Sequence, residues 1–190
     1  MGFTHYFPHE KVLKSVWTDI LAGCKRAHAL LPESIKITGC SKYGAEPHFG
    51  ADEIWFNGVS DEGHETFSLY RQGSGGFEFC KTARKPYDVL VVACLLIYAH
   101  FSPGTIELSS DGERKDWAAG KKLAESALGL AVEIPKTVVD YEPVEPKQTE
   151  RGWWTLTFTG VDELNDSDRE HIAQLIAEGF TSGEIVQENP

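Results

Sequence analysis

The run Val89–Ala99, VLVVACLLIYA, constrains the fold more than any other feature of the sequence. Its 11 residues include no charged side chain, and a helix built from them is apolar on every side. Such a helix has to be buried all round rather than on one face. It is too short to span a membrane, which takes about 20 apolar residues. Pro86 suits a helix start and Pro103-Gly104 a helix end, so the sequence predicts a central helix that packs on a sheet and is covered elsewhere.

The segments around this run predict an α+β fold with a mostly antiparallel sheet and helices packed on it. Helices are expected from Pro8 to Pro32, by apolar spacing near 3.6, and over 113–128. The stretch 41–51 is typical of a loop. The GSGG at 73–76 predicts that the strands on either side of it pair as an antiparallel meander. Strands are expected at 2–7, 34–40, 53–58, 64–71, 77–80 and 105–110.

The charge distribution divides the chain. Residues 1–136 carry 17 acidic and 15 basic side chains, whereas residues 137–190 carry 12 and 3. We expect a main domain at 1–136, a Pro- and acid-rich linker at 137–150, and a small acidic module at 151–190. The module should contain a strand at 153–160, a helix at 165–179 and a short strand at 183–186. The net charge of −11 argues against general nucleic-acid binding, which needs cations to neutralise phosphates.

The cysteines and the N-terminal residues bear on the cellular compartment. The four cysteines, Cys24, Cys40, Cys80 and Cys94, form no CxxC pair, so we expect free thiols and neither a metal site nor a cofactor. The opening MGFTHYFPHEK lacks a basic stretch followed by an apolar one, and we expect no signal peptide. These features favour a cytoplasmic protein without a membrane partner.

Several strings give the chain a resemblance to a known family. They are GFTHYF at the start, FNG and HETF in the middle, FCKTARKPYD, and SSDG followed by Trp117. Together they span positions 2–117 and resemble a family of proteins from phages and bacterial genomes. The segment from WWTLTF to EHIAQLIAEGFTSGEI is similar to a strand-helix module appended to other phage and bacterial proteins. The resemblance implies a bacterial cell or a phage-infected host as the setting, and it implies no particular chemistry.

The basic loop, which we define as residues 81–85, is the first candidate site. Lys81, Arg84 and Lys85 lie between an expected strand and the start of the apolar helix, where unpaired N–H groups already produce a positive field. Cations there make sense if an anion binds, with Thr82 as a further donor. The alternative is a solvated loop whose cations pair with Asp88, Glu78 or the acidic C-terminal segment.

The SSDG string is the second candidate, because Ser109, Ser110 and Asp111 also end a strand before a helix. If the two strands are neighbours, the hydroxyls can line the same pocket; otherwise this is an Asp-Gly turn with serine caps. His64 and Asp111 are candidates for acid/base catalysis, although His64 also fits an ordinary surface histidine. His5, between Phe3 and Phe7, fits a core residue, or a metal ligand only if His64 and Asp111 join it.

Three functions follow from these candidates. The first is binding of a small anionic ligand, a phosphorylated metabolite or a nucleotide, which in a phage context would serve sequestration or counter-defence. The second is an enzyme acting on such a ligand at the same pocket. The third is an acidic interaction protein or nucleic-acid mimic whose C-terminal module docks a protein partner.

Overall fold

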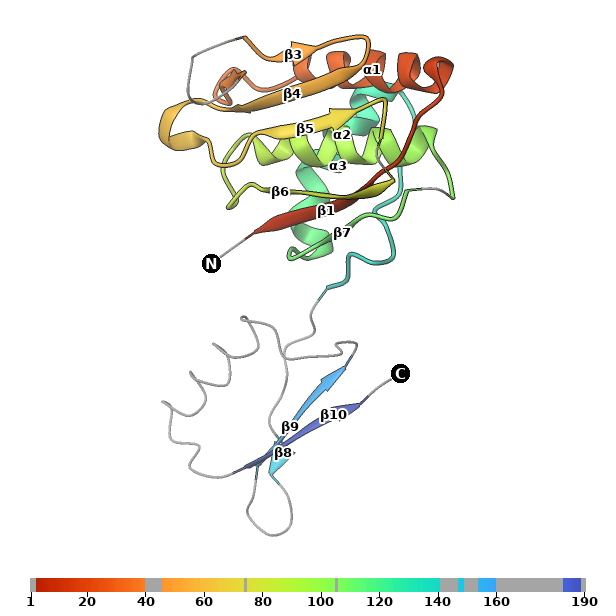
Figure 1. Cartoon of the computed structure of the whole chain (residues 1–190). Helices are drawn as coiled ribbons and strands as arrows, with labels where there is room; N and C mark the ends of the chain where they lie inside the picture. Colours follow the sequence, from red (N-terminus) through yellow and green to blue (C-terminus); the bar gives the residue numbers. More distant parts are fainter. Residues whose placement is uncertain are drawn as a thin grey trace. The chain divides into compact units, whose positions relative to one another are not determined.

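The computed structural model describes residues 3–39, 46–73, 75–104 and 106–140, together with the strands at 147–148, 154–159 and 183–188. Contacts divide the chain into two units, Gly2–Asp140 and Tyr141–Pro190, the second with Met1 (Figure 1). The first unit mixes helices with antiparallel strands, as the predicted α+β class requires.

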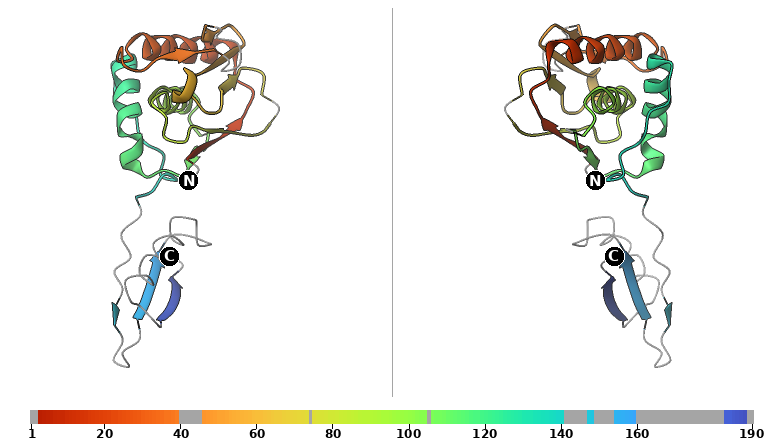
Figure 2. Two further views of the ribbon diagram at one scale, coloured as in Figure 1. Left: turned by 90° about the vertical axis from the view of Figure 1, so that its left-hand side faces the viewer. Right: turned by 90° about the vertical axis from the view of Figure 1, so that its right-hand side faces the viewer.

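Helix α2, Asp88–Phe101, is the centre of the first unit. Ten of its residues are buried, including every position from Leu90 to Tyr98. Figure 2 shows this helix nearly end-on, with α1 (Lys14–Ala29) and α3 (Arg114–Leu128) on two of its sides and strands on another. The prediction of a helix covered on all faces is confirmed. Among the described helices there is none whose length and apolar character would let it span a bilayer.

Close helix packing depends on two glycines. A Cβ on Gly23 of α1 would lie 2.9 Å from a side-chain carbon of Ile97 in α2. A Cβ on Gly120 of α3 would lie only 2.4 Å from Cγ1 of Val92 in α2. Both distances are shorter than carbon–carbon contact allows, so the missing side chains let α1 and α3 approach α2 closely.

The described strands of the first unit form two separate antiparallel groups. In the first, β1 (Thr4–His9) lies between β6 (Gly76–Lys81) and the two-residue β7 (Ser109–Ser110). In the second, β4 (Glu53–Gly58) pairs with β2 (Ile37–Thr38), β3 (His48–Phe49) and β5 (Phe67–Tyr70). A short 3-10 helix, Ser60–Glu62, follows β4.

Three local predictions differ from the structure. The expected meander between 64–71 and 77–80 does not form, because β5 pairs with β4 while β6 pairs with β1. The predicted loop at 41–51 contains β3 at its end. The first helix begins at Lys14 rather than after Pro8, because β1 continues through Pro8 at a point where β7 no longer pairs with it and a missing N–H costs little.

The second unit contains a three-stranded sheet among its described residues. Strand β9, Trp154–Thr159, lies between β8, Lys147–Gln148, which is antiparallel to it, and β10, Gly183–Glu188, which is parallel. The strands expected at 153–160 and 183–186 are thus present, while the helix expected at 165–179 lies outside the described residues.

The segment 137–150, predicted to be a linker, is ordered where it is described. Val138 is buried in the first unit, and its carbonyl oxygen accepts a hydrogen bond from Arg114 Nη1 at 3.2 Å. The hydroxyl of Thr137 donates to the carbonyl oxygen of Leu108. Lys147–Gln148 forms strand β8 of the second unit. The first unit therefore extends a few residues beyond the predicted limit of 136.

Candidate ligand-binding site at the end of β6

The basic loop 81–85 joins β6 to α2 and has an unusual backbone. Ala83 and Arg84 both adopt positive φ angles, 51° and 56°. Consecutive non-glycine residues in this left-handed region are uncommon, and each costs about 1 kcal/mol or more. The carbonyl oxygen of Phe3 holds the loop in place by accepting bonds from the backbone N–H groups of Thr82 (2.9 Å) and Ala83 (3.1 Å).

The side chain of Arg84 is exposed, but contacts with Asp116 and Phe3 fix its position. Its Nη2 atom lies 3.3 Å from Oδ2 of Asp116, and its guanidinium carbon lies 4.3 Å from the centre of the Phe3 ring. The side chain of Arg84 is 55% exposed. An ion pair this exposed contributes about 1 kcal/mol or less, so Arg84 can exchange Asp116 for another anion at small cost.

The two lysines of the loop, Lys81 and Lys85, are held by the segment that follows β4. Lys85 Nζ donates to the backbone carbonyl oxygen of Asp61 at 2.7 Å. The backbone of Lys81 is fixed by Glu65, whose Oε2 accepts from the Lys81 N–H at 2.7 Å. The alternative interpretation, in which the loop cations pair with native carboxylates, applies to Arg84, although its partner is Asp116 rather than Asp88 or Glu78.

A buried polar network lies beneath the loop. Asp88 Oδ1 accepts a bond from the Thr82 hydroxyl at 2.6 Å and lies 2.7 Å from His5 Nε2. The other ring nitrogen of His5 lies 3.0 Å from Ser110 Oγ, which also accepts from the Gly112 N–H. His5 and Thr82 are fully buried, and Asp88 is nearly so. The network joins β1, β7, the basic loop and the first turn of α2.

The order Ser110, His5, Asp88 is that of a hydrolase triad, but the surroundings favour a structural role. The His5 ring is enclosed edge-on by Phe3 and Trp117, at centroid distances of 5.1 and 5.2 Å. A general base has to exchange a proton with substrate, and a ring with no exposed surface has no path to one. The hydroxyl of Thr82, predicted to be a ligand donor, instead bonds to Asp88 inside the core, away from any surface ligand.

The outer face of the first sheet differs from this inner side. Strand alternation places Tyr6 of β1 beside Phe77 and Phe79 of β6, facing away from buried Cys80. Phe77 is 65% exposed and Phe79 54%. The rings of Tyr6 and Phe77 are stacked, 5.7 Å apart, and those of Phe77 and Phe79 are 6.4 Å apart. Lys81 is the next β6 residue on this face.

Asp111 and Ser109 border the same outer face. Ser109 is paired with Tyr6, and the Tyr6 hydroxyl donates to Asp111 Oδ1 at 3.0 Å. Burial of the Tyr6 hydroxyl and the nearby Asp111 carboxylate raise the pKa of Tyr6 above its usual value of 10. Strands β6 and β7 are not neighbours as the shared pocket required, because β1 lies between them. Ser109 and Ser110 are consecutive residues of β7, so Ser109 faces outward and Ser110 inward.

His64 lies at the basic loop, as an exposed side chain. Its Nδ1 atom lies 2.9 Å from the carbonyl oxygen of Lys81. His64 and Glu65 precede β5, which begins at Phe67, so they are not on a strand and both approach Lys81. Among the described residues no group of three or more His, Cys, Asp or Glu side chains is arranged to hold a metal, so His5, His64 and Asp111 do not form one there.

Cys80 is unsuited to nucleophilic chemistry. It is fully buried, and burial, with smaller contributions from Glu65 and Asp88, raises the pKa of its thiol far above the usual value. Nucleophilic cysteines need a lowered pKa and access to substrate, so the thiol belongs to the core.

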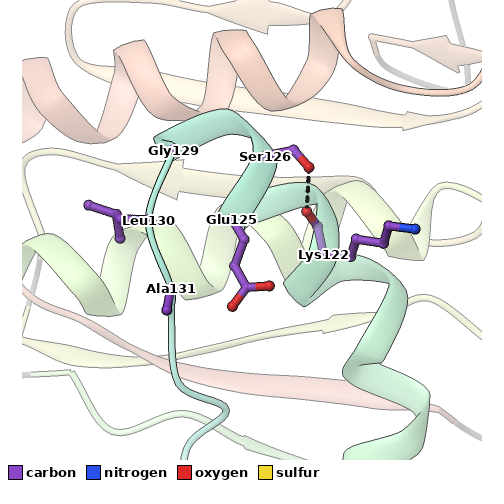
Figure 3. A pocket seen from close by; sticks show the side chains of 6 residues that line it. All are labelled: Lys122, Glu125, Ser126, Gly129, Leu130 and Ala131. Atoms are coloured by element: carbon purple, nitrogen blue, oxygen red, sulfur yellow. Dashed lines mark hydrogen bonds between the residues drawn. The ribbon is translucent and has the colours of Figure 1, made fainter.

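A shallow hollow of about 420 Å³ lies at the C-terminal end of α3, and none of the residues that line it is a predicted site residue (Figure 3). The carboxylate of Glu125 in it is already engaged by Lys121 and by the backbone N–H of Val132. We do not assign it a function. It is lined by Lys122, Glu125, Ser126, Gly129, Leu130 and Ala131.

The predicted site residues therefore fall into a surface set and an inward-facing set, and His5 and Asp88 link the inward-facing residues. The aromatic row of β6 was not among the predicted site residues, although FEF, with phenylalanines two apart, was the available signal. Comparison with protein family models, with curated proteins and with solved structures finds no match to this chain. The surface set consists of the exposed Arg84, Asp111 and His64 and the half-buried Lys81, Lys85 and Ser109, and the inward-facing set of the buried Thr82 and the half-buried Ser110.

Proposed function

We propose that the protein binds a small anionic ligand at the basic loop 81–85. The observation that carries this proposal is the combination of three cations, Arg84 exposed and Lys81 and Lys85 half-buried, with a strained and firmly anchored backbone at Ala83 and Arg84. Backbone strain of this kind persists where surrounding contacts impose it, and it gathers at functional sites. A rigid loop also presents its charges to a ligand without first having to be ordered.

The site for the anion is the exposed side of the loop rather than the axis of α2. The carboxylate of Asp88 already lies in the first turn of α2, where it satisfies the positive helix end. The cations that remain accessible are Arg84, which offers a planar fork for phosphate or carboxylate, and Lys81 and Lys85, which add positive charge.

Thermal unfolding with inorganic phosphate and with ribose 5-phosphate tests this proposal. Either anion at 100 times its Kd should add roughly 2.7 kcal/mol to the free energy of unfolding. Lys81→Ala with Arg84→Ala should abolish this stabilisation, and without ligand the double variant should differ from the parent by about 1 kcal/mol or less. The matched control is Lys14→Ala with Lys25→Ala, which removes the same charge from exposed positions of α1 and should keep the response.

Two results would contradict the proposal. One is that neither anion stabilises the parent protein. The other is that the unliganded double variant is strongly destabilised, since the cations would then serve the fold rather than a ligand.

A catalytic role at the same site is the second candidate, favoured by the exposed imidazole of His64 beside Lys81. A histidine in that position can transfer a proton to or from a bound ligand. Incubation of the protein with ribose 5-phosphate or a nucleoside monophosphate, followed by mass spectrometry, separates the two candidates. Product that forms with the parent and not with His64→Gln supports catalysis, and a ligand recovered unchanged supports binding alone.

A further inference from the structure

We propose that the outer face of the β6-β1-β7 sheet binds the base of a nucleotide whose phosphate lies at the basic loop. This inference rests on the proposed function and narrows its ligand class from anions in general to nucleotides. It concerns the aromatic face, which we define as Tyr6, Phe77 and Phe79.

The aromatic face is the unusual part of this surface. Two phenylalanines on one strand are more than half exposed, and Tyr6 stacks on one of them. Large apolar side chains scattered singly on a surface need no explanation, but a contiguous group indicates an interaction site. Exposed aromatic rings on a sheet are a stacking platform for bases, because every base has a flat π-face.

The cations next to the aromatic face favour a nucleotide over an uncharged apolar partner. Lys81 follows Phe79 on the same face of β6, two residues along, which places their Cα atoms roughly 7 Å apart. The basic loop with Arg84 begins at that point. A base stacked on Phe79 and a phosphate at Lys81 would thus be bound by neighbouring side chains on one face of the strand.

The polar groups on the other side of Tyr6 suit the sugar. Asp111 accepts a hydrogen bond from the Tyr6 hydroxyl, and its carboxylate has further acceptor sites for ribose hydroxyls. Ser109 lies beside Tyr6 in the sheet and adds a hydroxyl. One face thereby offers aromatic rings for a base, acceptors for a sugar and a cation for a phosphate.

A single nucleotide fits the charge better than a long nucleic acid does. The chain carries a net charge of −11, and even residues 1–136 have more acidic than basic side chains. Strong binding along a polyanion needs many phosphate contacts, whereas one phosphate needs only the local cations.

The test compares AMP with ribose 5-phosphate by isothermal titration calorimetry. Stacking of one base should make AMP bind about tenfold more tightly. Phe77→Ser with Phe79→Ser should remove this advantage and leave the affinity for ribose 5-phosphate unchanged. The matched control is Leu13→Ser with Leu30→Ser, two exposed apolar residues flanking α1, which should keep the tenfold ratio.

Any other result contradicts either the nucleotide inference or the proposed anion binding. Equal affinity of the parent for AMP and ribose 5-phosphate overturns the nucleotide inference and leaves anion binding intact, while no binding of either overturns both. An oligothymidylate of eight nucleotides that binds when AMP does not would assign the aromatic face to single-stranded nucleic acid. Loss of a dimer in the phenylalanine variant, seen by sedimentation with AMP affinity unchanged, would assign it to a second copy of the chain.

Discussion

The two faces of the β6-β1-β7 sheet carry the same kinds of residue in opposite circumstances. On the inner side Phe7 of β1 is 2% exposed and Asp88 of the adjoining helix α2 is nearly buried, whereas on the outer side Phe77 is 65% exposed and Asp111, which follows β7, accepts a hydrogen bond from the Tyr6 hydroxyl at the edge. Burial makes the contacts of the inner pair part of the core and makes the pair unavailable to ligands. Exposure gives the outer pair little structural effect and leaves it free for binding. The residue type alone does not distinguish a fold determinant from a candidate site residue, but the strand face does.

The largest expected difference is between the two phenylalanines. Phe7→Ala should lower the free energy of unfolding by about 3–5 kcal/mol, because it removes buried contacts and leaves a cavity. Phe77→Ala should change it by about 0.5 kcal/mol or less, as is usual for exposed positions. Urea unfolding followed by tryptophan fluorescence measures both, and similar losses would show that the aromatic face is a structural element.

The two aspartates should differ next. Asp88→Ala leaves His5 and Thr82 without their shared acceptor inside the core, and we expect a loss of about 3 kcal/mol. Asp111→Ala removes one exposed hydrogen bond and should cost about 1 kcal/mol or less. If Asp88→Ala unfolds at the same urea concentration as the parent, the buried network does not hold the sheet to α2.

A smaller change is expected where α3 crosses α2. Gly120→Ala should destabilise the protein by about 1–3 kcal/mol although alanine favours helices, because its methyl group would overlap Val92. Gly104→Ala is a useful comparison, since a Cβ there meets no neighbour and its positive φ of 77° is the only source of strain. Thermal unfolding of both variants separates crowding from backbone strain, and a Gly120→Ala variant as stable as the parent would show that the helices can move apart.

The smallest effect is electrostatic. Asp111→Asn should lower the pKa of Tyr6, because it removes a negative charge that opposes ionisation, while burial, the larger cause, keeps that pKa above 10. The raised pKa gives a stability contribution that is present below about pH 10 and is lost as the pH rises further, so the loss should be smaller in the variant. Ring carbon shifts of Tyr6 followed by NMR between pH 8 and pH 12 report the change, and an unchanged titration would mean that Asp111 does not act on Tyr6.

The sequence predicted those features that depend on local pattern. The apolar run identified α2 because its 11 residues are more than a buried strand usually has and proline or glycine flanks both of its ends. The alternation in 2–7 and 77–80 identified β1 and β6. Strand β3 was missed because two residues, His48 and Phe49, are too few to show a period.

Features that depend on distant partners were not predictable from one sequence. The GSGG turn favoured local pairing, but β6 pairs with β1, so that Cys80 lies opposite His5. The Asp88–His5–Ser110 contacts join residues far apart in the chain, and no spacing rule brings them together. The basic loop was identified from sequence because its cations are close together in the chain. The Asp116 partner of Arg84 was not identified, because it lies 32 positions away.

The position of β1 in its sheet has a consequence for the order in which the chain folds. Within this sheet the central strand is synthesised before its two partners, β6, which begins at Gly76, and β7, which begins at Ser109. Until then both edges of β1 have unpaired N–H and C=O groups, and Phe3 and Phe7 are exposed on a growing chain. Long-range pairing of this kind slows folding and leaves an intermediate open to aggregation. The N–H groups of Thr82 and Ala83 in the basic loop bond to the carbonyl oxygen of Phe3. The loop can therefore assume its conformation only after β1 and β6 have paired.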